Sequence, residues 1–147
     1  MTGVMGEEKP ASICLTPKLQ AFVLADQVYV DALSAKKVIC GTFNALWGEK
    51  FPTCLQQTSK AYLCMTNCRG QQKIHLKYVD LETGNVLMES SDVVVESSDP
   101  IQIQEVVMDV PPLPMPHPGS YAMDAYSQGE QIGSIRILVC QKGKSAL

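Results

Sequence analysis

The fold of this chain is decided by residues 119–139, which read GSYAMDAYSQGEQIGSIRILV. Apolar and polar side chains alternate on both sides of Gly129, as in strands whose successive side chains point to opposite faces. Ser127, Gln128 and Gly129 predict a three-residue hairpin loop with glycine at positive φ and a glycine bulge. The residues that share the predicted core faces are Tyr121, Met123 and Ala125, then Ile135, Ile137 and Val139. The pattern therefore predicts an antiparallel hairpin.

The hairpin is preceded by a proline-rich segment, residues 110–118, which reads VPPLPMPHP. Each proline fixes φ near −65° and removes a donor, so this segment favours polyproline II. Pro111 and Pro114 have the spacing of a ligand for an aromatic groove, but no arginine or lysine flanks them. We therefore predict a stiff crossing between two sheets that protects a sheet edge, with Leu113 and Met115 capping the core.

The rest of the chain is also built from strand patterns. These occur in residues 20–31, 37–47, 61–66 and 74–79, from 86 toward 95, and in 101–110. The patterns at 61–66 and 74–79 predict a second hairpin, and Gly41 predicts a bulge or a close backbone contact. Apolar residues do not recur at helical spacing over 11 residues or more. We predict an all-β fold, an antiparallel β-sandwich of about 7–8 strands, immunoglobulin-like or C2-like.

Length and composition predict one globular domain. The 147 residues are 46% hydrophobic and 18% charged. A chain of this size and composition buries a sufficient core without disulfides or a structural metal ion. We expect a flexible arm over 1–18, the sandwich over 19–141 and a short tail over 142–147. The net charge of −3 does not favour nucleic acid, and no signal peptide or apolar span suggests a membrane. We therefore expect a soluble, cytoplasmic protein.

Cysteines offer the nearest approach to a chemical site. In a reducing compartment they are expected to be free thiols. Zinc takes four Cys or His ligands, so a site of Cys54, Cys64, Cys68 and His75 is conceivable, with His75 facing Cys64 across the predicted hairpin. The alternative is that Cys64 packs as a small hydrophobe and Cys68 lies in an exposed turn. A reactive Cys68, with its thiolate stabilised by Arg69, is a separate hypothesis, whose alternative is that Arg69 is simply solvated. We predict no metal and no cofactor.

Other catalytic or ligand-binding patterns are weak. His75 and His117 have no companion carboxylate at suggestive spacing, so both are expected to face solvent. Calcium takes 6–8 oxygens, and neither Asp80 with Glu82 nor the acids of residues 92–99 are dense enough, so turn chemistry explains them better. No glycine-rich loop leads from a strand into a helix, as a phosphate site would require. We predict no catalytic residue.

Several of these segments together carry a family resemblance. They are residues 25–28, 37–43, 51–52, 80–87 and 119–139. Over residues 22–139 the chain resembles an uncharacterised bacterial family of small β-sandwich proteins. The resemblance implies an immunoglobulin-like or C2-like fold and no catalytic residue. The segment around Cys64 and Cys68 is not part of the family pattern.

A sandwich without a catalytic constellation offers surfaces to partners. We expect a non-enzymatic bacterial binding or assembly module that binds a protein partner or self-associates. The contact would use strand edges or the apolar strip Val93–Val95. The alternative is a metal- or thiol-dependent protein that uses the Cys64 and Cys68 region.

Overall fold

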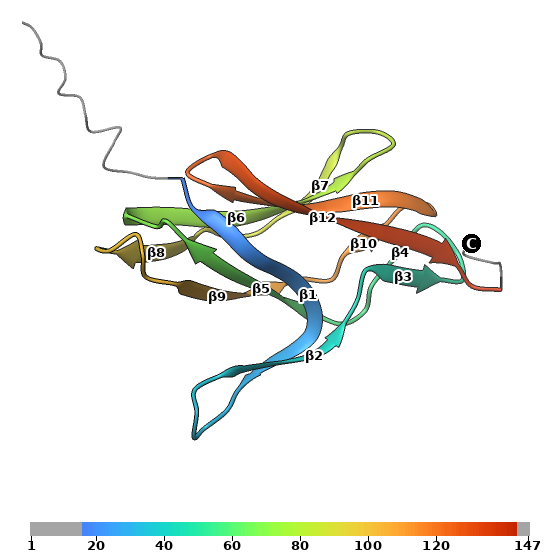
Figure 1. Cartoon of the computed structure of the whole chain (residues 1–147). Coiled ribbons are helices and arrows are strands. Elements are labelled where there is room, and N and C mark those ends of the chain that lie inside the picture. The colour runs from blue at the N-terminus through green and yellow to red at the C-terminus, as the bar shows by residue number, and fades with distance from the viewer. Residues whose placement is uncertain (1–15, 144–147) are drawn as a thin grey trace, which may run out of the picture.

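The structure is a computed structural model that describes residues 16–143, and in this range it is an all-β protein (Figure 1). The first strands are β1 (Lys18–Val30), β2 (Lys37–Thr42), β3 (Ala45–Gly48), β4 (Thr53–Cys54), β5 (Ser59–Thr66) and β6 (Gly70–Asp80). The others are β7 (Val86–Glu89), β8 (Val93–Ser97), β9 (Gln104–Val110), β10 (Pro114–Met115), β11 (Gly119–Ser127) and β12 (Glu130–Gln141). Among residues 16–143 no helix is long and apolar enough to cross a membrane.

Two sheets pack face to face. The first has the order β2-β1-β5-β9 and is antiparallel throughout. The second has the order β3-β12-β11-β6, and both β7 and β8 pair with the outer edge of β6. Its strands are antiparallel except that β3 runs parallel to β12. The short strands β4 and β10 form a separate pair. The predicted antiparallel β-sandwich is confirmed, and residues 16–143 form twelve strands where about 7–8 were expected.

The strand order is that of an immunoglobulin-like sandwich. The chain starts in the first sheet with β1 and β5, crosses to β6, returns to β9, and crosses again to the β11–β12 hairpin. These strands correspond to A, B and E in one sheet and C, F and G in the other. The prediction left the choice between immunoglobulin-like and C2-like open, and this order selects the first.

The core lies between the inner faces of the two sheets. Tyr121, Met123, Ala125 and Ile137 are fully buried there, as predicted, while Ile135 is half-buried and packs against the core. Alternate side chains enter because successive residues of a strand point to opposite faces. Other buried core residues include Leu24, Leu63, Met65, Ile74, Leu76 and Tyr78.

The β11–β12 hairpin is confirmed, but its loop is shorter than predicted. Ser127 pairs with Glu130, so only Gln128 (φ 53°) and Gly129 (φ 81°) form the loop. Positive φ at both positions defines a two-residue turn of type I′, whose twist matches that of the strands. The bulge lies farther along the hairpin, where the register shifts between Ala125 and Tyr126.

The predicted hairpin of residues 61–66 with 74–79 is wrong. These residues form β5 and β6, which lie in opposite sheets. The connection at 67–70 is a crossing between the sheets, with positive φ at Asn67 and Gly70. Both strands bury alternate residues in the same core, so the apolar pattern is the same for a hairpin and for a crossing. The pattern alone therefore does not separate the two.

The run at residues 37–47 splits into two strands in different sheets. β2 pairs with β1 in a hairpin that projects from the sandwich (Figure 1), whereas β3 joins β12. The predicted close contact at Gly41 is confirmed, because a Cβ there would lie 2.4 Å from Oδ2 of Asp26 and φ is +72°. This position requires glycine, since other residues are strained at such a φ. The run from 86 toward 95 is likewise divided, into β7 and β8.

The proline-rich segment crosses from β9 in the first sheet to β11 in the second, as predicted. Leu113 and Met115 are 0% and 2% exposed, so both cap the core. Residues 114 and 115 also pair with β4.

The predicted domain limits lie close to the ends of the strands. β1 begins at Lys18, and Pro17 before it is buried. β12 ends at Gln141. Residues 1–15 of the predicted arm and 144–147 of the predicted tail lie outside the described residues.

Candidate functional site

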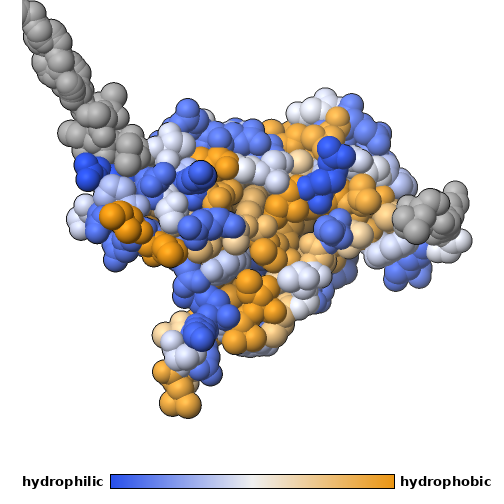
Figure 2. Space-filling model, viewed as in Figure 1, coloured by the Kyte–Doolittle hydropathy of each residue, from blue (hydrophilic) through white to orange (hydrophobic). Residues whose placement is uncertain are grey.

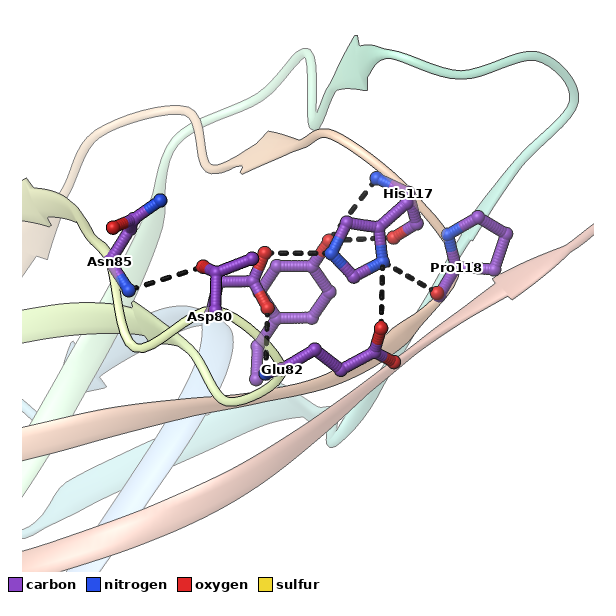
Figure 3. Close-up of polar contacts among 7 residues, drawn as sticks. Asp80, Glu82, Asn85, His117 and Pro118 are labelled. Atoms are coloured by element: carbon purple, nitrogen blue, oxygen red, sulfur yellow. Dashed lines mark hydrogen bonds and ion pairs between the residues drawn. The ribbon is translucent and has the colours of Figure 1, made fainter.

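A cluster of polar side chains joins the end of β6 to the proline-rich crossing (Figure 3). His117 Nε2 lies 2.7 Å from Oδ2 of Asp80, and His117 Nδ1 lies 2.7 Å from the carbonyl oxygen of Pro118. Glu82 Oε1 is 3.8 Å from the same Nδ1. Oδ1 of Asp80 accepts a hydrogen bond from the Glu82 amide at 2.9 Å. The cluster thus joins the β6–β7 turn to the segment that enters β11.

Tyr121 binds the backbone of the same corner. Its hydroxyl donates to the His117 carbonyl oxygen at 2.6 Å and accepts from the His117 amide at 3.2 Å. A tyrosine near the start of strand F whose hydroxyl bonds the backbone a few residues upstream is the tyrosine corner of immunoglobulin-like domains. The Tyr121 ring also stacks on that of Tyr78, with centroids 5.4 Å apart.

The environment favours the charged forms of both His117 and Asp80. The pKa of His117 is raised, first by the Pro118 carbonyl and then by Asp80. Both ring nitrogens face acceptors, and only the imidazolium ion can donate from both. Burial raises the pKa of Asp80, but the bonds from His117 and the Glu82 amide outweigh it, so the net pKa is lowered. The Asp80 side chain is 4% exposed and that of His117 31%, so a buried carboxylate is paired with a half-buried imidazolium ion.

Stability should therefore depend on pH through this pair. Because its folded-state pKa is raised above 6.5, His117 stabilises the fold fully below that pH and loses the contribution as pH rises through the folded pKa. Asp80 stabilises above 3.8 and loses its contribution at more acidic pH. Urea unfolding from about pH 5 to pH 9 should show the wild type losing its advantage over His117→Gln as pH rises. A difference that is constant with pH would contradict the assignment.

The predicted zinc ligands are not brought together. Cys64 lies on β5 and His75 on β6, in opposite sheets, so His75 does not face Cys64. Cys68 is fully buried at the crossing between the sheets, which corrects its placement in an exposed turn. Cys54 lines a surface groove instead. Among residues 16–143 no group of three or more His, Cys, Asp or Glu could hold a metal ion.

Cys64 and His75 have ordinary partners in this fold. The Cys64 thiol donates to Oε1 of Gln20 at 3.6 Å. The His75 ring stacks on Tyr126, with centroids 5.1 Å apart. The sequence predicts that His75 is exposed to solvent. It lies on the outer face of the sheet, but the stacked ring of Tyr126 leaves it half-buried.

Thiol reactivity should follow burial. Burial raises the pKa of Cys68, and the thiolate is the reactive form. Cys40 on β2 is exposed. With a thiol reagent and peptide mapping by mass spectrometry, we expect Cys40 to react quickly in the native protein and Cys68 only after unfolding. Cys40→Ser should remove the fast labelling assigned to this position. Fast labelling of Cys68 in the folded protein would contradict this prediction.

One edge of the second sheet is basic and carries an aromatic side chain. Trp47 on β3 is 45% exposed and lines a groove of about 540 Å³ together with Lys50 and Lys142. β3 pairs only with β12 among the described strands, so its other edge has no ladder partner there and borders the groove, which is also lined by residues 52–57 and Met115. We call β3 with Lys50 and Lys142 the Trp47 edge. Glu49 is the acidic residue in this groove.

The opposite edge of the same sheet is acidic and apolar. It consists of β7 and β8, whose outer edges have no partner strand within residues 16–143. Val86 is 47% exposed and Val94 52% exposed, and Glu89 and Glu96 are exposed beside them. We call β7 with β8 the valine edge. Of the predicted strip Val93–Val95, only Val94 is exposed, because Val95 is 7% exposed and belongs to the core.

Hydrophobic side chains also gather in a band across the middle of the face shown in Figure 2 and at one projecting tip. A groove of about 290 Å³ of mixed polarity is lined by Phe22, Phe43 and Ile135 together with Thr42 and Asn44. At the tip of the β1–β2 hairpin, Leu33 is 98% exposed. Lys37 ties this hairpin to Glu105 on β9 by an ion pair of 2.9 Å.

The strand order and the tyrosine corner define an immunoglobulin-like β-sandwich protein. The chain belongs to a family of unknown function, DUF6941, whose model matches residues 20–140. The predicted membership of an uncharacterised β-sandwich family is thereby confirmed. A comparison with curated proteins finds no match.

Solved structures of similar proteins include two with low sequence identity. An immunoglobulin-like protein from Pseudomonas aeruginosa is 11% identical, with a TM-score of 0.43 over 85% of this chain and 97% of that one. The C-terminal domain of Wzt is 12% identical, with a TM-score of 0.44 over 88% of this chain and 74% of that one.

Proposed function

We propose that this chain is a non-enzymatic binding or assembly module that contacts proteins through the open edges of its second sheet. The observation that carries the proposal is that both edges expose large apolar side chains, Trp47 at one and Val86 and Val94 at the other. Natural proteins normally protect sheet edges with charges, proline or bulges. An apolar open edge suits the addition of a strand from a partner.

The polar cluster supports the non-enzymatic part of the proposal. Both nitrogens of His117 are within hydrogen-bonding distance of Asp80 and the Pro118 carbonyl. The Tyr121 hydroxyl is likewise used by the backbone of the corner. These groups join β6 to β11, so their hydrogen-bonding atoms stabilise the fold.

Site-specific photo-crosslinking in the native cells tests this proposal. A photoreactive amino acid is placed at Val86 or Val94, with exposed Thr83 in the β6–β7 turn as the matched control. We expect adducts of discrete mass from the two edge positions and none from the control. If neither edge position gives an adduct while the variants remain folded, the proposed function is overturned.

A further inference from the structure

Charge is segregated along the sequence, and this gives the two edges opposite signs. Residues 78–135 contain ten Asp and Glu residues and no Lys or Arg. This stretch includes β7 and β8, and hence Glu89 and Glu96. The Trp47 edge is formed by residues from outside this stretch and contributes Lys50 and Lys142. The valine edge and the Trp47 edge are therefore electrostatically complementary.

The directions of the strands make the two edges geometrically compatible. β3 is parallel to β12, β12 is antiparallel to β11, and β11 is antiparallel to β6. β3 and β6 therefore run the same way, and β7 and β8, which are antiparallel to β6, run the opposite way. A second copy displaced sideways along the sheet, without being turned over, would thus place its valine edge antiparallel to β3.

The same displacement brings the exposed apolar residues to one face. Val86 pairs with Val79, and Val94 with Lys73, so both valines lie on the outer face of the sheet. Trp47 pairs with Cys140 and lies on that face too. In a continuous sheet, side chains that neighbour each other across strands on one face are in contact. A valine of one copy would therefore cover Trp47 of the next.

We infer that the occupant of the Trp47 edge is a second copy of this chain, whose valine edge adds to β3 and continues the sheet head to tail. This inference rests on the proposed function and names its partner. The contact is heterologous, since different surfaces meet, and repetition gives a ring or an open filament. Its short strands make it a small interface, so the association is expected to be weak and to weaken further in salt.

Charges of the opposite sign also lie near each edge. Lys73 and Lys77 lie on β6, where Lys77 pairs with Glu89, and Arg69 precedes β6. Because β6 lies one strand inside the edge, Glu89 and Glu96 meet the neighbouring copy first. Glu49 offsets one of the two lysines of the groove. The Trp47 edge keeps a net positive charge, and attraction between the two edges remains.

Charge reversal on separate edges tests the inference. One variant carries Lys50→Glu and Lys142→Glu, and the other carries Glu89→Lys and Glu96→Lys. Sedimentation velocity on purified proteins, up to about 1 mM because the contact is small, gives the oligomeric state. We expect the wild type to associate with rising concentration and each variant alone to associate at least about tenfold more weakly. An equimolar mixture should regain association, since its edges are complementary again.

The chain provides its own reporter and control. Trp47 is its only tryptophan, so its emission should change as the edge is covered. The control is Lys18→Glu with Lys36→Glu, which changes the net charge as much as Lys50→Glu with Lys142→Glu does, at exposed positions away from the Trp47 edge. This control should associate at nearly the wild-type level.

Three results would overturn the inference. They are a wild type that stays monomeric at every concentration, either edge variant that associates alone like the wild type, and a mixture that stays monomeric. Association of one edge variant alone would point to an interface between identical edges instead. A monomeric protein whose edges still crosslink to a different protein in cells would overturn the self-assembly while leaving the proposed function standing.

Discussion

Replacing Asp80 with alanine should lower the free energy of unfolding by about 3 kcal/mol, because the buried carboxylate binds both the His117 ring and the Glu82 amide, and hydrogen bonds to a charged group are the strong ones. The Asp80 side chain is 4% exposed and binds the His117 ring. It also accepts a hydrogen bond from the Glu82 amide at the start of the β6–β7 turn. Urea unfolding near neutral pH measures the loss.

The control for Asp80→Ala is Asp124→Ala. Asp124 also accepts a side-chain hydrogen bond, from Ser134 at 2.6 Å, but that bond is exposed. We expect this change to cost at most about 0.5 kcal/mol, as surface substitutions usually do. If the two variants lose the same stability, the corner does not depend on the ion pair.

The second large effect is expected at Tyr121. Tyr121→Phe keeps the ring but removes the hydroxyl that bonds both the amide and the carbonyl of His117. The loss of these bonds at the corner should cost about 2 kcal/mol. Chemical denaturation with unchanged m-value would show that the native state is weakened without a change in compactness.

Tyr78 gives a matched comparison, because its ring stacks on that of Tyr121. Its hydroxyl is buried and has no hydrogen-bond partner among residues 16–143, and burial raises its pKa. Tyr78→Phe removes an unsatisfied polar group, so stability should stay the same or rise. A loss at Tyr78 as large as that at Tyr121 would contradict the different roles assigned to the two hydroxyls.

The sandwich could be predicted because alternating side chains report which residues enter the core. Residues 119–139 gave the correct strands, and the prolines before them gave the correct crossing. The pairing partners could not be read in the same way. β5 and β6 are adjacent in sequence and have matching patterns, yet each binds other strands. Alternation records burial, whereas pairing depends on where the connection leads the chain.

The polar corner and the charged edges depend on contacts distant in sequence. His117 and Asp80 are 37 residues apart, and no local spacing suggests that they meet. The tyrosine corner had a local signal, since Tyr121 follows His117 by four residues at the start of a predicted strand. The acidic stretch 78–135 was also visible in the sequence, but its meaning required the strand order that places β3 and β8 at opposite edges.

The projecting β1–β2 hairpin has a consequence for how the molecule fluctuates. Beyond Ala25, β1 pairs with β2 and no longer with β5, and residues 29–36 are exposed. Segments with few buried contacts open locally, at a free energy well below that of global unfolding. Amide hydrogens of Tyr29 and Val38 should therefore exchange with solvent while those of Leu63 and Met123 stay protected. The hairpin can then change shape without weakening the sandwich.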